Sequence, residues 1–251
     1  MGRVRIDGVW RVTAGVAAFG TLLAGLSACG GASGGGGTRS GGAPGSAAKA
    51  SQSPPADSTR IPGIGDRLYR HIPADSSQVV VATGAGRNSA ETTVMLYTRR
   101  GTRWHAAGSW PAHNGRQGWT TDHHEGDKRS PVGVFTLSDA GGVLPDPGAK
   151  LPYDHNAAGY ATPRYWAASH RHDFDYVIAI DYNRVKGTAP LDGTRPLGQE
   201  KGGGIWLHLD HGSGTSACVS VSEEAMRYLL RTLDPARHPV IVMGDRADLG
   251  G

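Results

Sequence analysis

The stretch from residue 204 to residue 223 reads Gly204-Ile-Trp-Leu-His208-Leu-Asp-His-Gly-Ser-Gly-Thr-Ser-Ala-Cys218-Val-Ser-Val-Ser-Glu223. Its first part alternates, with Ile205, Leu207 and Leu209 on one face. Trp206 and His208 fall on the other face. Alternation with period two is typical of a half-buried strand. The stretch therefore predicts a strand over residues 205–209 that carries a histidine.

A turn and a helix are predicted after this strand. Residues 212–215 contain two glycines and predict a turn. Ser220 and Glu223 match a capping box, in which a serine and a glutamate three residues later accept backbone N–H groups at a helix start. Apolar residues then recur at helical spacing at Met226, Leu229, Leu230 and Leu233. We expect Cys218 to lie just ahead of the N-terminus of a helix over residues 223–233.

Cys218 and His208 suit nucleophilic catalysis. A thiol attacks as its thiolate, and its pKa falls near a helix N-terminus or a protonated histidine. In that role His208 accepts the thiol proton, and the backbone N–H groups of Ser216, Ala217 and Cys218 stabilise an oxyanion. The alternative is that Cys218 is a buried small apolar residue beside an unrelated imidazole. The spacing alone leaves both interpretations open.

Two motifs resemble the active-site region of the YkuD-type L,D-transpeptidase family. That family places a histidine at the end of a strand and then a Ser/Thr-x-Gly-Cys segment, which His208 and Thr215-Ser-Ala-Cys218 match. An upstream segment reads Pro131-Val-Gly133-Val-Phe135, like the Pro-x-Gly-x-aromatic segment of the family. Ser and Ala stand where many members have His-Gly before the cysteine. The resemblance covers about residues 60–245 and implies a mainly β sandwich or barrel with a short helix after the catalytic cysteine.

The resemblance also implies a reaction on peptidoglycan stem peptides. The Cys218 thiolate attacks the third stem residue, His208 delivers a proton to the departing D-Ala, and an amine of a neighbouring stem converts the thioester into a cross-link. The backbone carbonyl of Leu209 orients the imidazole, and Ser216 and Ala217 contribute to the oxyanion site. Water in place of the amine gives an L,D-carboxypeptidase or hydrolase. The third interpretation is a lipoprotein that binds the cell wall without catalysis.

Two loops are the expected walls of this site. Residues 139–175 lack periodicity and are rich in proline and aromatics, which predicts a lid or an Ω-loop held by its own aromatic side chains. Residues 183–204 lead into the histidine strand, so Asn183 and Arg195 are candidate substrate contacts. Arg195 suits either a substrate carboxylate or a surface ion pair. The remaining candidates are Tyr182, Gly204, Pro131 and Gly133.

The N-terminal residues have the composition of an export signal and a linker. Residues 1–28 combine arginines with a short apolar segment and end in Leu-Ser-Ala before Cys29, which is typical of a bacterial lipoprotein signal peptide. An ordinary secretion signal is the alternative. Residues 29–59 are rich in glycine, serine and proline and predict a flexible linker. We expect one catalytic domain over residues 60–251, exported and lipid-anchored through Cys29 to the outer face of the bacterial cytoplasmic membrane, facing the cell wall.

Composition and strand patterns set further bounds. The chain has 251 residues and a formal net charge of +4, and no basic cluster indicates a nucleic-acid partner. Further apolar or alternating runs predict strands at 78–83, 92–99, 104–110, 133–138, 176–182 and 239–243. A hairpin turn is expected at Arg100-Gly101. With a single convincing helix pattern, the fold is expected to be mainly β.

No cofactor and no metal are expected. His113, His123 and His124, with Asp122 and Asp127 nearby, match no zinc spacing. A minor alternative is a ligand set formed by His208, Asp210, His211 and Cys218.

Overall fold

The computed structural model describes residues 59–251. The predicted signal peptide, Cys29 and nearly all of the predicted linker lie outside these residues. The strands are β1 (Gln78–Gly84), β2 (Glu91–Arg100), β3 (Arg103–His113), β4 (Trp119–Thr120), β5 (Ser130–Pro131), β6 (Gly133–Thr136), β7 (Ala140–Gly142), β8 (Tyr153–His155), β9 (Val177–Ala179), β10 (Trp206–Leu209), β11 (Val219–Val221) and β12 (Val240–Asp245). The helices are α1 (Asp66–Tyr69), α2 (Glu223–Thr232) and α3 (Arg246–Gly250), with 3-10 turns η1 (Ala168–His170), η2 (Gln199–Lys201) and η3 (Pro235–Arg237).

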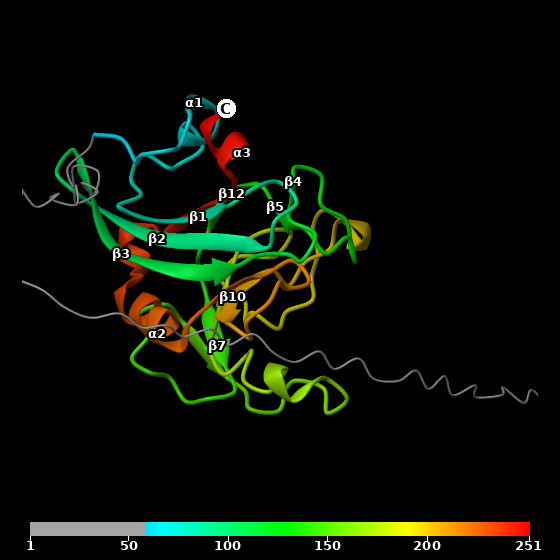
Figure 1. Cartoon of the computed structure of the whole chain (residues 1–251). Helices are drawn as coiled ribbons and strands as arrows, with labels where there is room; N and C mark the ends of the chain where they lie inside the picture. Colours follow the sequence, from blue (N-terminus) through cyan, green and yellow to red (C-terminus); the bar gives the residue numbers. More distant parts are fainter. Residues whose placement is uncertain (1–58) are drawn as a thin grey trace, which may run out of the picture. The chain divides into compact units, whose positions relative to one another are not determined.

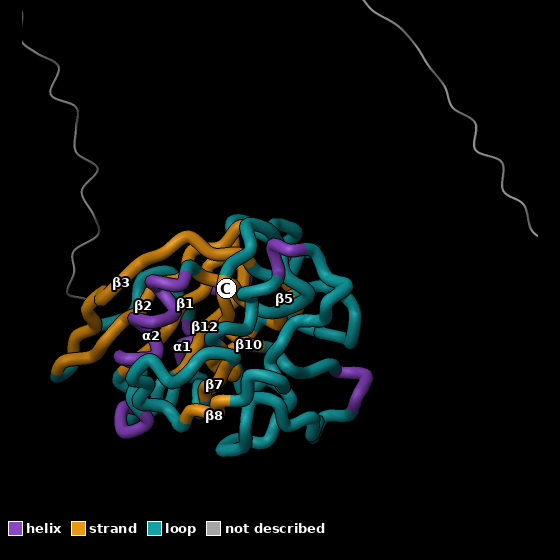
Figure 2. The backbone as a smooth tube through the Cα atoms, turned by 90° about the horizontal axis from the view of Figure 1, so that it is seen from below, coloured by secondary structure: helices purple, strands orange, loops and turns teal. Residues whose placement is uncertain are grey.

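Most of the described strands belong to one mixed sheet, in the order β6-β12-β1-β2-β3-β11-β10-β9-β7-β8. β4 and β5 form a separate parallel pair. Long loops, teal in Figure 2, cover the side of the domain where β5, β7 and β8 lie. The prediction of a mainly β fold is confirmed. Within residues 59–251, no helix combines the length and the apolar character that crossing a lipid bilayer requires.

β1 is buried on both faces because the sheet separates two apolar cores. Val80 and Ala82 pack into the larger core, and Val79 and Val81 pack into the smaller one. Successive side chains of a strand point to opposite faces, so a continuous valine run suits a strand covered on both sides. Buried residues of α2 join the larger core, while α1 and α3 lie together over β12 and cover the smaller one (Figure 1).

The structure contains the predicted hairpin, but it differs in part from the predicted loop. β2 and β3 pair antiparallel to their ends at Arg100 and Arg103, and Gly101 adopts a φ of 59°, which glycine tolerates. The hairpin is therefore confirmed. The expectation of no regular structure over residues 139–175 is wrong for β7 and β8, which pair in parallel at one edge of the sheet. A strand of three residues is too short to show the alternation of apolar and polar side chains from which a strand is predicted.

The helix after the cysteine begins at Glu223, as predicted, but its N-cap differs from the predicted one. Its N-cap is Ser222, whose hydroxyl accepts the N–H of Ala225 at 3.2 Å. The predicted Ser220–Glu223 capping box is wrong, because Ser220 lies in β11. That strand also separates Cys218 from α2. The expected placement of the cysteine at a helix N-terminus is therefore wrong.

Candidate active site

Parallel pairing of β10 with β11 brings His208 and Cys218 together. His208 lies opposite Ser220, and Leu207 lies opposite Val219. Paired residues share a face of a sheet and every second residue returns to it, so Cys218 falls on the same face as His208. Both residues line a cavity of about 560 Å³, a volume typical of a small-ligand or peptide pocket.

The loop predicted as a lid supplies one wall of this cavity. Its lining residues are Trp166, Ala167, His170, Asp173 and Phe174. Phe174 lies edge-on to Trp206 and His208, with ring centroids 5.3 Å and 5.4 Å away. Tyr160 is fully buried and donates its hydroxyl to Asp154 at 3.0 Å. The loop is thus held by its own aromatic side chains while it also walls the cavity.

His208 is held in one tautomer and is neutral. The residue is 3% exposed, and its Nδ1 lies 2.8 Å from the carbonyl oxygen of Leu209. A carbonyl only accepts, so Nδ1–H donates to it and Nε2 is left free to take a proton. Burial lowers the pKa of His208 to about 4, although the Leu209 carbonyl and the charge of Asp173 oppose that shift.

Cys218 carries a protonated thiol. Its sulfur accepts the N–H of Trp206 at 3.4 Å and donates to the carbonyl of Gly204 at 3.6 Å. Burial of the sulfur raises the pKa of Cys218 to about 11, the Trp206 N–H lowers it, and the charge of Asp173 raises it further. The predicted lowering of the thiol pKa is wrong, because burial outweighs the Trp206 hydrogen bond and β11 separates Cys218 from the helix N-terminus.

The backbone around the cysteine is held by two hydroxyl groups. Ser130 Oγ donates to the Ala217 carbonyl at 2.6 Å, and Thr215 Oγ1 donates to the Cys218 carbonyl at 2.7 Å. Within residues 59–251, the N–H groups of Ser216, Ala217 and Cys218 donate no hydrogen bond to the protein. In a trans peptide the N–H points away from the C=O, so anchoring the Ala217 carbonyl aims the Cys218 N–H in the opposite direction. These N–H groups are therefore available to an oxyanion.

The residues proposed from sequence as substrate contacts are mostly placed elsewhere. Gly204 lines the cavity, and Arg195 and Asn183 do not. Arg195 pairs with Glu125 at 2.7 Å, which is the surface ion pair left open above. Asn183 is buried and donates to the carbonyls of Gly198 and Gly202 at 2.9 and 2.5 Å. Both side chains stabilise the loop over residues 183–204, and among the cavity's lining residues the guanidinium belongs to Arg116.

The upstream motif lies outside the cavity, and the residue directly before it contacts the cysteine segment. Pro131 lies in β5, and Gly133 lies in β6 opposite Met243, both outside the cavity lining. Ser130, directly before them, is fully buried and reaches the cysteine segment. Ser130 therefore anchors the backbone of the segment that carries Cys218. Tyr182 is also outside the lining and donates its hydroxyl to the Lys201 carbonyl at 2.8 Å.

Asp210 does not join His208 and Cys218. Its carboxylate accepts from His113 Nδ1 at 2.7 Å and from the Ser220 hydroxyl at 2.6 Å. The metal set of His208, Asp210, His211 and Cys218 is therefore wrong. These two partners hold the carboxylate, and Asp210 is not among the residues that line the cavity.

Asp173 is one of the residues of this site that the sequence did not predict. Its backbone carbonyl accepts the Leu209 N–H at 2.9 Å, next to the carbonyl that holds His208. Its carboxylate Oδ2 lies 2.9 Å from His170 Nδ1 and 3.2 Å from His211 Nδ1. An aspartate in an aperiodic segment carries no sequence signal of such contacts, except that His170-x-x-Asp173 has the spacing of one helical turn.

Comparison with known proteins gives one family. The family model of the L,D-transpeptidase catalytic domain (YkuD) matches residues 75–242. No curated protein is significantly similar to the chain. Among solved structures the chain is similar to the structure of Bdellovibrio bacteriovorus Bd1075, with 16% identity and a TM-score of 0.37, over 66% of this chain and 47% of that chain. The chain thus spans about half the length of that structure.

Proposed function

The chain belongs to the YkuD family of L,D-transpeptidase catalytic domains, and on that premise we propose that it is a peptidoglycan L,D-transpeptidase that works through a thioester on Cys218. One observation carries the proposal. Cys218, His208 and unbonded backbone N–H groups meet at a single cavity. These are the nucleophile, base and oxyanion donors that acyl transfer requires.

In the proposed acylation step, His208 Nε2 removes the thiol proton as Cys218 Sγ attacks the carbonyl of the third stem residue. The pKa of Cys218 is raised and that of His208 is lowered, so a thiolate–imidazolium ion pair is disfavoured before substrate attack. Proton transfer from the thiol to the imidazole therefore accompanies the attack. The N–H groups of residues 216–218 receive the oxyanion. The C–N bond then breaks, and D-Ala leaves with the proton from His208.

In the proposed second step, an amine of a neighbouring stem attacks the thioester. His208 takes a proton from the amine, the C–S bond breaks, and Cys218 recovers its proton. The products are a cross-linked dimer and free enzyme. If water attacks instead, the enzyme is an L,D-carboxypeptidase, so the exclusion of water by the wall over residues 166–174 decides the outcome.

A product analysis tests this proposal. We would incubate the full chain with a disaccharide-tetrapeptide and follow products by mass spectrometry, with a stem ending in L-Ala as the control because the bond before it is not an L–D bond. Loss of D-Ala together with a dimer is the expected result. Loss of D-Ala without a dimer moves the assignment to carboxypeptidase. An intact substrate with folded protein contradicts catalysis on this stem and favours a wall-binding lipoprotein.

The pH profile of acylation distinguishes a neutral thiol–imidazole pair from a preformed thiolate pair. His208 acts only while neutral, and its pKa of about 4 means that activity is lost as pH falls through that value. We expect kcat/KM for D-Ala release to be flat from about pH 5.5 to 9. A rising limb near pH 6.5, the ordinary histidine value, contradicts the neutral pair. Circular dichroism at each pH separates this limb from acid unfolding.

The N-terminal residues support a proposal on location. We propose that the chain is exported and lipid-anchored through Cys29, because residues 1–28 have the composition of a lipoprotein signal and the run before Cys29 has small residues. The full chain expressed in bacteria that are fed an alkyne fatty acid should become labelled and sediment with membranes. Cys29→Ala should lose both properties. A labelled, sedimenting alanine variant contradicts the assignment.

A further inference from the structure

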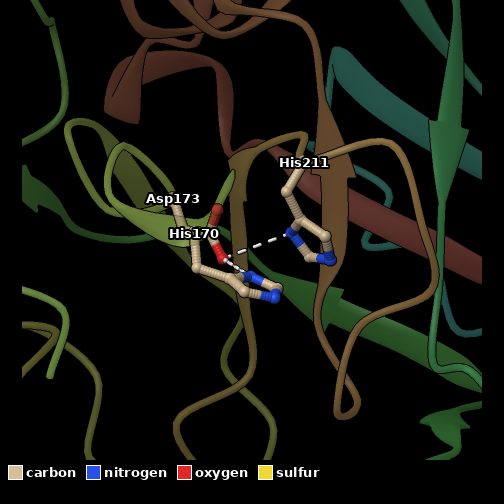
Figure 3. A group of neighbouring side chains, drawn as sticks. All are labelled: His170, Asp173 and His211. Atoms are coloured by element: carbon tan, nitrogen blue, oxygen red, sulfur yellow. Dashed lines mark hydrogen bonds and ion pairs between the residues drawn. The ribbon is translucent and has the colours of Figure 1, made fainter. Parts of the chain in front are cut away.

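His170, Asp173 and His211 form a cluster on the wall of the cavity. Asp173 Oδ2 lies 2.9 Å from His170 Nδ1 and 3.2 Å from His211 Nδ1. One atom from each of the three side chains lies within 4.8 Å of the others. Figure 3 shows the carboxylate beside both rings, with a dashed line from one oxygen to a nitrogen of each. The loop before β9 and the turn after β10 are thereby brought together.

These separations fit the coordination sphere of a small divalent ion. Zinc–nitrogen and zinc–carboxylate bonds are about 2.0–2.2 Å long. Two ligand atoms of a tetrahedral ion are then about 3.3 Å apart, and two adjacent ones of an octahedral ion about 2.9 Å. The two distances to Asp173 Oδ2 lie within or at this range. Asp173 Oδ2 therefore lies at metal-ligand spacing from both histidine nitrogens before any ion binds.

Two of the three groups are too buried to be satisfied by solvent. The side chains of Asp173 and His211 are each 4% exposed. His211 Nδ1 makes no hydrogen bond of acceptable geometry, although it lies near the carboxylate. Buried nitrogens without a partner are rare, and buried carboxylates are normally paired or coordinate a metal. A shared ion satisfies both the lone pair of His211 and the charge of Asp173.

A second histidine–aspartate pair in the same loop lacks the third ligand that the cluster has. His172 Nδ1 lies 2.8 Å from Asp175 Oδ2, with the same sequence spacing as His170 and Asp173. The side chain of His172 is 78% exposed, and among residues 59–251 it belongs to no cluster of three potential metal ligands. It is therefore an ordinary surface pair, and it supplies a matched control in the same loop.

We propose that His170, Asp173 and His211 form a binding site for a divalent transition-metal ion such as Zn²⁺. The two histidines coordinate through Nδ1 and the aspartate through Oδ2. Imidazole donors select Zn²⁺, Cu²⁺ or Ni²⁺ over Mg²⁺ and Ca²⁺, which prefer oxygen. Three protein ligands leave a fourth position for water. The bound ion ties the loop before β9 to the turn after β10, and the site stands independently of the proposed reaction.

The test is a zinc titration of the full chain after treatment with a chelator, by calorimetry and by metal content after gel filtration. We expect one equivalent of Zn²⁺ in the wild type and in His172→Gln. His170→Gln should bind at least ten times more weakly, and it should fold because the His170 side chain is 31% exposed. His211→Gln, with a buried side chain, is the second variant. Excess Mg²⁺ should not displace Zn²⁺.

Cys218→Ala separates this site from one built on the thiol. The variant should keep the full zinc affinity, and Co²⁺ in the wild type should give visible d–d bands without a thiolate charge-transfer band. Loss of zinc binding in Cys218→Ala overturns the proposal and assigns the ion to the thiol. Absence of binding in the wild type overturns it as well, as does equal affinity in His170→Gln and His172→Gln.

Discussion

Cys218→Ala is expected to abolish the release of D-Ala, with kcat/KM falling by about 10⁴-fold or more, because no second nucleophile can form the acyl intermediate. The side chain that is lost is small, and its recorded partners are backbone groups of Gly204 and Trp206. The fold should therefore remain intact. The measurement is steady-state kinetics with the tetrapeptide stem, with circular dichroism on the same samples.

The intact mass of the protein completes this prediction. Wild-type enzyme quenched during turnover should carry an adduct of the stem on Cys218 that hydroxylamine removes, and the alanine variant should carry none. Ser213→Ala is the matched control, since Ser213 is exposed and lies outside the cavity lining. Residual turnover of the Cys218 variant above about one hundredth of the wild-type rate contradicts thioester catalysis.

His208→Gln is expected to lower kcat/KM by about 10²- to 10⁴-fold, the usual contribution of a general base. Glutamine retains a polar side chain that can donate to the Leu209 carbonyl, but it cannot take up the thiol proton. The thiol must then ionise unaided. Because the pKa of Cys218 is raised to about 11, the residual activity of this variant should increase with pH up to about 9, where the wild type is flat.

His124→Gln is the matched control for this substitution, since His124 is exposed and outside the cavity lining. Activity within about threefold of the wild type in His208→Gln assigns the base to another group. His211 is then the first candidate, because its ring is stacked with that of His208 at 6.2 Å and also lines the cavity. A residual activity that stays flat with pH is equally incompatible with a thiol that ionises unaided.

Local sequence patterns predicted the elements that carry the chemistry. Alternation located β10, the valine run located β1, and helical spacing located α2. Each pattern reflects which side chains face a core, and the spacing of those apolar side chains can be read from residues close together in the sequence. The N-cap of α2 is Ser222 and not the predicted Ser220. Both serines are suitable caps, and β11, at three residues, is too short to be predicted as a strand from its sequence.

By itself, the sequence determined a mainly β domain, the strand that carries His208, and the cysteine that follows it. Only the tertiary structure decided the protonation of the site and the partners of its distant residues. Burial in the folded domain raises the pKa of Cys218 and lowers that of His208. Packing also directs Arg195 to Glu125 and brings Asp173 to His211. Desolvation and long-range contacts depend on how segments that are far apart in the sequence pack together. The spacing of apolar residues within one segment does not predict this packing.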